Sequence, residues 1–102
     1  MADVRNIIFQ TGSANVPSII GSVSALIANT ARAGWFIQNL GQNALYVRLG
    51  TAASTSVFHF ALKAGTANDD GTGGSISQTD GVVYTGVISV AGTSPRYTAM
   101  EL

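Results

Sequence analysis

Two neighbouring stretches near the middle of the chain carry the clearest strand patterns. Ala44–Leu49 alternates between apolar and more polar side chains, which is the period of a strand with one buried face. Trp35–Leu40 is apolar except at Gln38 and Asn39, as in a central strand covered on both faces. Gly41-Gln42-Asn43 separates the two stretches, and glycine and asparagine tolerate positive φ at little cost. The pattern therefore predicts two strands joined as a hairpin by a three-residue loop.

Shorter apolar runs predict further strands. In Ser56–Leu62, the side chains of Phe58, Phe60 and Leu62 share one face, which should point to the core. Ser18–Ala28 also holds a weak helical stripe, but a glycine and two serines disfavour a helix interior, so a strand is favoured. The remaining strands are expected at Asn6–Gln10, Gly81–Val90 and Arg96–Leu102.

Polar segments rich in glycine, serine, asparagine or proline separate these runs and predict turns and loops. They are Thr11–Pro17, Asn29–Ala33, Thr51–Thr55, Lys63–Asp80 and Ala91–Pro95. About seven short strands at regular spacing, without βαβ alternation, predict an all-β fold: a small antiparallel β-sandwich or a jelly-roll-like barrel. We expect a single β domain over residues 18–102, with residues 1–17 forming an N-terminal arm or an edge strand.

The composition narrows the classes of partner. Of the 102 residues, 46% are hydrophobic and 10% are charged, against about 25% charged in ordinary domains. Five basic and five acidic residues cancel, so we expect neither a nucleic-acid partner nor an anionic membrane. A surface with so little charge protects poorly against association. This predicts that partners, or further copies of the chain, cover much of the surface.

Several kinds of chemistry have no support in the residue types present. The chain has no cysteine, so disulfides and thiolate chemistry are excluded. No apolar run approaches the length of a membrane span, and Met1–Arg5 does not read as the start of a secretory signal. His59 is the only histidine and cysteine is absent, so the chain lacks the usual ligand set of a zinc site. Serines are plentiful, but none lies in a strand–turn–helix elbow, so we expect His59 on an outer strand face or at a subunit contact.

Three other patterns were weighed as sites. Asn68–Gly73 offers hard oxygen ligands for calcium, but it lacks the twelve-residue spacing and the distal glutamate, so a solvated turn is favoured. Gly71–Gly74 does not fit a phosphate cradle, because no Lys-Ser/Thr pair follows it. Trp35, Phe36 and Tyr46 could stack on bases or sugars, but aromatic residues on strands more often form core or cross-strand pairs. We therefore expect no catalytic, metal-binding or cofactor-binding residue, and no enzyme activity.

The segment Ala31–Asn39, followed by Ala44–Gly50, resembles a pattern found in small virion proteins of tailed bacteriophages. In that pattern an arginine precedes an aromatic strand ending in Ile-Gln-Asn, and a glycine turn leads to a second strand that ends in a glycine. Phe58–Phe60, Gly71–Ile76 and Val90–Tyr97 resemble later parts of such proteins. The family uses the same β-unit in head and in tail components, and it implies a structural role without an active site.

The resemblance implies a capsid decoration or cement protein that binds and stabilises the major capsid shell. Such a protein is made in the host cytoplasm and lies on the capsid exterior. Symmetric placement on a shell favours a homo-oligomer, with a trimer natural at a threefold position. We expect Ala2–Pro17 to be an arm that orders on a neighbour, and Lys63–Asp80 to be a second contact. Two alternatives stay open: a tail, fibre or adaptor component, and a carbohydrate- or receptor-binding module using Tyr46, Tyr84 or Tyr97.

Overall fold

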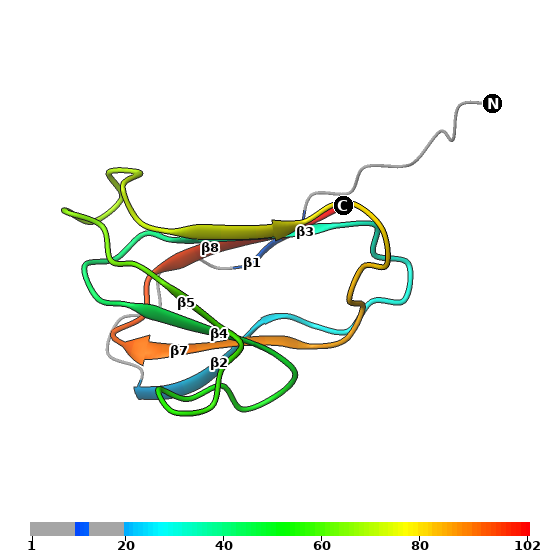
Figure 1. Ribbon diagram of the computed structural model, residues 1–102, viewed down its shortest axis with the longest axis horizontal. Coiled ribbons are helices and arrows are strands. Elements are labelled where there is room, and N and C mark those ends of the chain that lie inside the picture. The colour runs from blue at the N-terminus through cyan, green and yellow to red at the C-terminus, as the bar shows by residue number, and fades with distance from the viewer. Residues whose placement is uncertain (1–9, 13–19) are drawn as a thin grey trace.

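The computed structural model describes residues 10–12 and 20–102, and within these ranges the chain forms eight β-strands and no helix (Figure 1). There is accordingly no helix in the described ranges that could cross a membrane. The strands are β1 Gln10–Gly12, β2 Ile20–Leu26, β3 Trp35–Asn39, β4 Leu45–Leu49, β5 Phe60–Leu62, β6 Ser75–Gln78, β7 Ile88–Thr93 and β8 Tyr97–Glu101.

The strands form two four-stranded antiparallel sheets, with orders β1-β8-β3-β6 and β2-β7-β4-β5. The pairs β1–β8, β2–β7, β3–β6 and β4–β5 are successive rungs of one long antiparallel ribbon. The ribbon is wrapped so that its rungs alternate between the sheets, which face each other in Figure 1. Eight strands wrapped in this way form a jelly roll. The predicted all-β, antiparallel sandwich is confirmed, and the strand order selects the jelly-roll form of it.

The predicted hairpin between β3 and β4 is wrong. β3 pairs with β8 and β6, whereas β4 pairs with β7 and β5 in the other sheet. The loop containing Gly41-Gln42-Asn43 therefore crosses between the sheets, and its amide and carbonyl groups bond to neighbouring loops. Turn residues indicate a tight change of direction, but they do not specify whether the next strand stays in the same sheet.

β4 shows the predicted alternation of buried and exposed side chains. β3, which was predicted to be covered on both faces, also alternates. Leu45 and Val47 are almost fully buried, which confirms a strand with one core face. In β3, only Trp35, Ile37 and Asn39 are buried, while the alternate side chains are half-exposed on the outer face. The expectation that β3 is covered on both faces is therefore wrong. Both sheets contribute to the buried core, whose members are Ala25, Leu26, Trp35, Ile37, Leu45, Val47, Leu62, Ile88, Val90, Tyr97 and Ala99.

Two predicted strands are shorter than expected. Only Phe60–Leu62 of Ser56–Leu62 is a strand, and Phe58, predicted in the core, is 40% exposed. Its ring lies against Tyr46 instead, with 4.8 Å between the centroids. Of Gly81–Val90, only Ile88 onward belongs to a strand, and the preceding residues form an irregular connection.

Two predicted loops contain strand residues. β7 continues through Gly92 to Thr93, where a turn was predicted, and a Cβ at Gly92 would lie 2.8 Å from the carbonyl oxygen of Ala44. Glycine at this position lets the backbones at Gly92 and Ala44 approach each other closely. β6 lies within the predicted loop Lys63–Asp80 and pairs with β3. Because Ser75, Ser77 and Gln78 are hydrophilic and only Ile76 is apolar, the sequence of β6 shows no clear strand pattern. The predicted strands Ser18–Ala28 and Arg96–Leu102 are confirmed as β2 and β8.

The N-terminal predictions are mostly outside the described ranges. Gln10–Gly12 is an edge strand antiparallel to β8, although Thr11 and Gly12 had been assigned to a turn or extended arm. Residues 6–9 of the predicted strand and 13–17 of the predicted turn are not described, so an N-terminal arm stays a prediction.

The outer faces of the two sheets differ. Residues 50–59 fold over the β2-β7-β4-β5 sheet, where the Ser89 hydroxyl donates to the Gly50 carbonyl and accepts from the amide of Ala53. Ser89 and Ala53 are consequently buried. On the β1-β8-β3-β6 sheet, the outward side chains of β3, β6 and β8 remain at least partly exposed. They carry no charge: Phe36, Gln38, Ser75, Ser77, Thr98 and Met100.

Candidate interaction site

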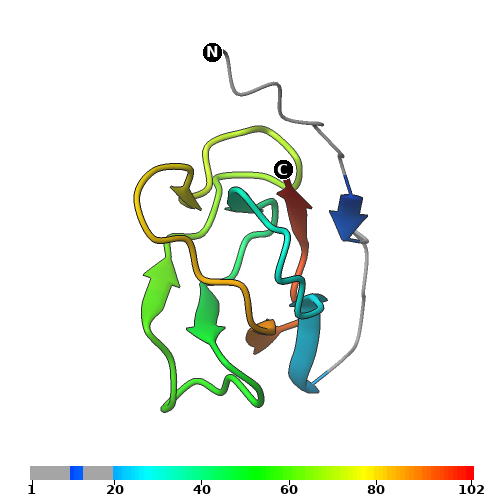
Figure 2. The same cartoon turned by 90° about the vertical axis from the view of Figure 1, so that its right-hand side faces the viewer.

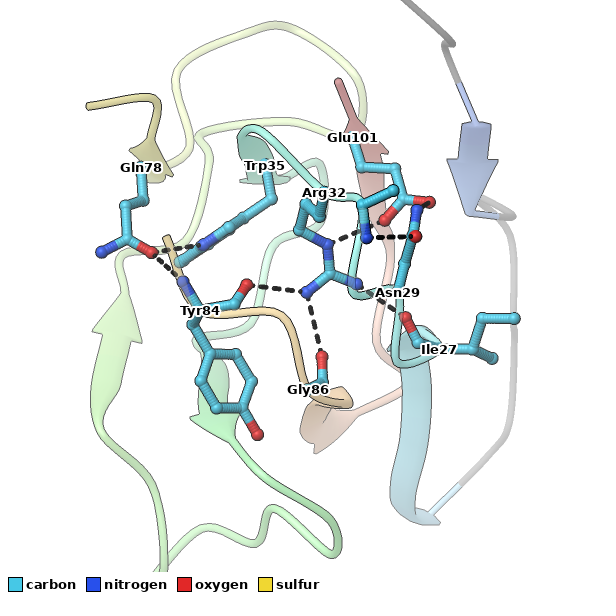
Figure 3. Close-up of polar contacts among 9 residues, drawn as sticks. Ile27, Asn29, Arg32, Trp35, Gln78, Tyr84, Gly86 and Glu101 are labelled. Carbon is cyan, nitrogen blue, oxygen red and sulfur yellow. Dashed lines mark hydrogen bonds and ion pairs between the residues drawn. The ribbon is translucent and has the colours of Figure 1, made fainter. Parts of the chain in front are cut away.

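A buried ion pair fixes one end of the sandwich (Figure 3). The Arg32 Nε donates to Glu101 Oε1 at 2.8 Å, and both side chains are almost completely buried. The remaining guanidinium nitrogens donate to three backbone carbonyls in two segments: Ile27 in one, Tyr84 and Gly86 in the other. Arg32 thus joins β8 to the connections that follow β2 and β6. A charge this deeply buried needs such a complete set of partners, which indicates a structural role.

Gln78 extends this network to the core (Figure 3). Its Oε1 accepts from the indole Nε1–H of Trp35 at 3.0 Å and from the amide of Tyr84 at 2.8 Å. Its Nε2 donates to the carbonyl of Val82. The Gln78 side-chain amide therefore accepts the hydrogen bond of the buried indole and also bonds to the backbone at Val82 and at Tyr84. Among the described residues, every buried side-chain nitrogen or oxygen has a hydrogen-bond partner.

Asn39 organises the opposite end. Its Oδ1 accepts from the amide of Gly41, and its Nδ2 lies within hydrogen-bond distance of three carbonyls, those of Asn43, Leu62 and Lys63. The side chain is 1% exposed. Because these partners belong to the β3–β4 connection, the end of β5 and the loop after β5, Asn39 fixes these segments relative to each other.

Backbone hydrogen bonds link a third loop to these two. The Leu40 amide donates to the Arg96 carbonyl, and the Leu40 carbonyl accepts from the Asp69 amide, each at 2.8 Å. The Gly65 amide donates to the carbonyl of Gly41. We call the three loops, residues 40–44, 63–74 and 94–96, the loop platform. A Cβ at Gly73 would lie 2.1 Å from the Asn39 carbonyl oxygen, so the platform requires glycine there.

The platform's charged side chains are largely engaged within it. Asp69 forms an ion pair with Arg96, and this hydrogen bond lowers the pKa of the Asp69 carboxyl and raises the pKa of Arg96. Asp70 accepts hydrogen bonds from the hydroxyls and amides of its own loop, at Thr66, Ala67 and Thr72. These bonds, led by the Thr66 hydroxyl, lower the pKa of Asp70 to about 2. With Lys63, the platform has two positive and two negative groups and no net charge.

A hollow of about 200 Å³, with both polar and apolar surface in its lining, opens on the platform. All three loops contribute to its lining, which consists of Gly41, Gln42, Asn43, Asn68, Ser94, Pro95 and Arg96. These residues carry side-chain amides, a hydroxyl and the Arg96 guanidinium, which is already paired to Asp69. Such groups can exchange hydrogen bonds with a polar, uncharged surface, and loops on a rigid scaffold are a common place for binding.

The residues weighed for catalysis or metal binding do not converge. His59 is exposed, and its Nδ1 accepts from the Leu49 amide at 2.9 Å, so the imidazole caps the neighbouring strand. The Asn68–Gly73 carboxylates are bonded to protein donors, as described above. Within residues 10–12 and 20–102, no group of three or more histidine, cysteine, aspartate or glutamate side chains could hold a metal ion.

The aromatic residues considered for ligand stacking lie apart. Trp35 and Tyr97 are each 2% exposed, so the prediction of an exposed Tyr97 is wrong. Burial raises the pKa of the Tyr97 phenol. Tyr84 packs against the core from the connection after β6, and Tyr46 lies against Phe58 on the outer side of the other sheet. Of the three tyrosines named as alternatives for a glycan site, Tyr46 and Tyr84 are thus partly exposed and Tyr97 is not.

The residues that shape the platform were not identified from the sequence as functional. The sequence pattern marks Asn39 only as a strand residue, and at the opposite end of the sandwich it marks Glu101 only as part of the last strand. The sequence did contain one pointer, because Arg32 precedes the aromatic strand and Asn39 ends it in the motif described in the sequence analysis. The structure gives those positions a physical reason: one polar side chain fixes each end of the sandwich.

Comparisons with known proteins give no assignment. No protein-family model, no curated protein and no solved structure matches this chain.

Proposed function

We propose that this chain is a virion structural protein of the capsid decoration or cement type. In this proposal the loop platform binds the exterior of the major capsid shell and stabilises it. Neither nucleic acid nor a membrane takes part. The resemblance described above implies the major capsid protein as the partner, and we place the contact with it on the loop platform.

The observation that carries the proposal is the hydrogen-bonded platform centred on Asn39. Its loops are cross-linked before any partner arrives, so docking orders few additional groups and loses little conformational entropy. Its surface is polar and has no net charge, which suits an interface with many hydrogen bonds and bridging water. Asp69 and Arg96 are paired with each other, and Asp70 is hydrogen-bonded within its own loop. These bonds favour a contact role over a catalytic one.

Co-sedimentation with capsids tests the proposal. Heads assembled from the major capsid protein of the phage that encodes this chain, without the chain itself, would be mixed with the purified protein. We expect saturable binding in many copies per head, with platform residues at the contact in a cryo-electron microscopy map. Absence of binding to such heads would refute the assignment.

Two matched variants locate the contact. Asn68→Glu adds a negative charge at the rim of the platform hollow, where the side chain is exposed. Thr55→Glu adds the same charge at an exposed loop position in residues 50–59, away from the platform. We expect Asn68→Glu to weaken head binding by about tenfold or more, equivalent to about 1.4 kcal/mol, and Thr55→Glu to bind like the wild type. Equal binding by both variants would remove the platform from the proposal.

The same experiment separates the tail alternative. A tail, fibre or adaptor component would bind at one position on the virion in a small ring of copies, whereas a cement protein would cover the shell. Copy number per particle therefore distinguishes the two roles.

The platform hollow favours a second candidate function, binding of a glycan. Its amides and hydroxyl match the donors and acceptors of a sugar, although the described residues lining it include no aromatic ring. A glycan array probed with the purified chain tests this role. Binding that Asn68→Glu abolishes would support it, and an array without hits would refute it.

A further inference from the structure

Two Asp-Gly pairs lie at opposite ends of the sandwich. Asp70-Gly71 belongs to the loop platform, and Asp80-Gly81 lies in the connection of residues 79–87 between β6 and β7. In Figure 1 the platform loops are at the left and this connection is at the right, and Figure 2 shows the connection bowing outward from the strands on one side. Such pairs are chemically reactive, because a glycine has no Cβ to keep the preceding aspartate side chain away from its amide nitrogen.

The two glycines are equally open. Gly71 has a φ of 81° and Gly81 has a φ of 71°, and at both positions a Cβ would meet no atom within 4 Å. Within residues 10–12 and 20–102, neither glycine amide donates a backbone hydrogen bond. Both aspartates are exposed as well. A difference in reactivity between the two pairs must therefore come from the carboxyl groups.

The two carboxyl groups differ in their partners. Oδ1 of Asp70 accepts from the amide and the hydroxyl of Thr72, and Oδ2 accepts from the Thr66 hydroxyl and the Ala67 amide. These bonds hold the carboxyl in place and keep it ionised, since they lower its pKa to about 2. In the part of the chain that the structure describes, no hydrogen bond or ion pair holds the carboxyl of Asp80.

The surroundings of Asp80-Gly81 leave room for a reaction. Both residues line a hollow of about 360 Å³, which gives water access to the pair. Arg32 also lines this hollow, but its guanidinium is already bonded to Glu101 and to three carbonyls. It therefore has no remaining need for the Asp80 carboxylate as a partner.

We propose that Asp80-Gly81 is a site of spontaneous isomerisation, at which Asp80 becomes isoaspartate through a succinimide. The Gly81 amide nitrogen bonds to Cγ of Asp80, and the carboxyl hydroxyl leaves with the amide hydrogen as water. Water then adds to the main-chain carbonyl carbon of Asp80 and breaks its bond to the Gly81 nitrogen, so that the chain continues through Cγ. Addition of water at Cγ instead restores aspartate. Both routes return the water that was lost, so the mass is unchanged and no other reactant is needed.

The contacts around the turn confine the change. Isomerisation adds one methylene to the main chain at position 80. Gln78 precedes this point and bonds to the backbone at Val82 and at Tyr84, which follow it. Because these anchors lie outside the reacting pair, we expect the isomerised chain to stay folded and to accumulate. This inference does not depend on binding to a capsid.

Incubation of the purified full chain in warm, mildly acidic buffer for several weeks tests the proposal. An endoproteinase that cleaves before aspartate does not cleave before isoaspartate, and electron-transfer fragmentation of the peptides locates the changed residue. The neutral carboxyl is the reactive form, because its hydroxyl can leave as water. We expect at least about tenfold more isoaspartate at position 80 than at position 70, because the lowered pKa of Asp70 reduces its neutral form by more than about tenfold. No isoaspartate at position 80, or equal amounts at both positions, would overturn the proposal.

Two variants and an unfolded sample identify the cause. Asp80→Glu would have to close a larger ring, so the product at position 80 should disappear. The double variant Thr66→Val and Thr72→Val removes the hydroxyl donors to Asp70, so isoaspartate at position 70 should rise severalfold while position 80 keeps its rate. Fluorescence of Trp35 checks that both variants are folded.

The wild-type chain in guanidinium chloride gives the comparison without the fold. We expect the two Asp-Gly pairs to react there at similar rates, because the hydrogen bonds to Asp70 are lost. A folded double variant whose position 70 stays unreactive, or an unfolded chain that still reacts only at position 80, would show that the carboxyl bonds do not select the site and would overturn the proposal.

Discussion

Replacement of Arg32 should be among the most damaging single changes in the molecule. Arg32→Met keeps most of the length and the apolar stem of the side chain but removes all of its donors. The Glu101 carboxylate would then be left buried with only the Asn29 amide as a partner. The carbonyls of Ile27, Tyr84 and Gly86 would lose a donor at the same time.

The expected loss of stability follows from this set of partners. Breaking a buried ion pair by removing one member costs about 3–5 kcal/mol, because a charge remains buried without compensation. Both side chains are buried to within 3% of complete exclusion from solvent, so solvent screening offers little relief. Small domains have a free energy of unfolding of about 5–15 kcal/mol. Arg32→Met should therefore remove a fifth or more of the total and lower the melting temperature by roughly 15–30 °C.

A second variant makes the prediction sharper. Glu101→Gln leaves the guanidinium without a counterion, but three carbonyls and the new amide oxygen can still accept its hydrogen bonds. We therefore expect Glu101→Gln to destabilise less than Arg32→Met, which removes a donor from four acceptor groups at once. Equilibrium unfolding in urea, followed by fluorescence of the single, buried Trp35, measures both free energies. An Arg32→Met variant within about 1 kcal/mol of the wild type, or the opposite order of the two variants, would refute the reasoning.

The remaining predictions concern the loop platform. Asn39→Leu removes one acceptor and two donor hydrogens from a buried position, so it should cost about 2–4 kcal/mol in urea unfolding, while the exposed Asn43→Ala stays near the wild type. Equal effects of the two would contradict the central role of Asn39. Asp70 has a folded pKa of about 2, below its ordinary 3.8, so its contribution to loop stability is complete above about pH 3.8 and is lost as the pH falls through about 2. Hydrogen exchange at the amides of Ala67 and Thr72 should show this loss in the wild type. In Asp70→Asn the protection should no longer change over this pH range. A variant that loses protection between the same pH values as the wild type would contradict the prediction.

The sequence was sufficient for the fold class because its information is local to each strand. The alternation in Leu45–Leu49 and the apolar residues of β8 identify half-buried strands, and the glycine-rich segments separate them. Pairing is not local: β3 finds its partners at Ser75–Gln78 and Tyr97–Glu101, far along the chain. Nothing in Trp35–Leu49 distinguishes a hairpin from a crossing between sheets, so the predicted hairpin failed.

The site was harder to predict for a related reason. Asn39 gains its importance from carbonyls of Leu62 and Lys63, which its own strand does not contain. Arg32 and Glu101 are separated by most of the chain, and each alone looks like an ordinary surface charge. Phe58 shows the opposite error, because its place in an alternating run suggested the core while the β4–β5 connection carries it outside. Long-range polar contacts of this kind cannot be read from spacing alone.

The position of β8 between β1 and β3 has a consequence for synthesis. β3 leaves the ribosome well before Tyr97–Glu101, which is one of its two hydrogen-bonding neighbours. Until that strand emerges, the edge of β3 is open and available to other nascent chains on the same messenger RNA. Folding of this protein should therefore finish only after β8 has left the exit tunnel, and its yield in a cell should depend on how crowded those polysomes are.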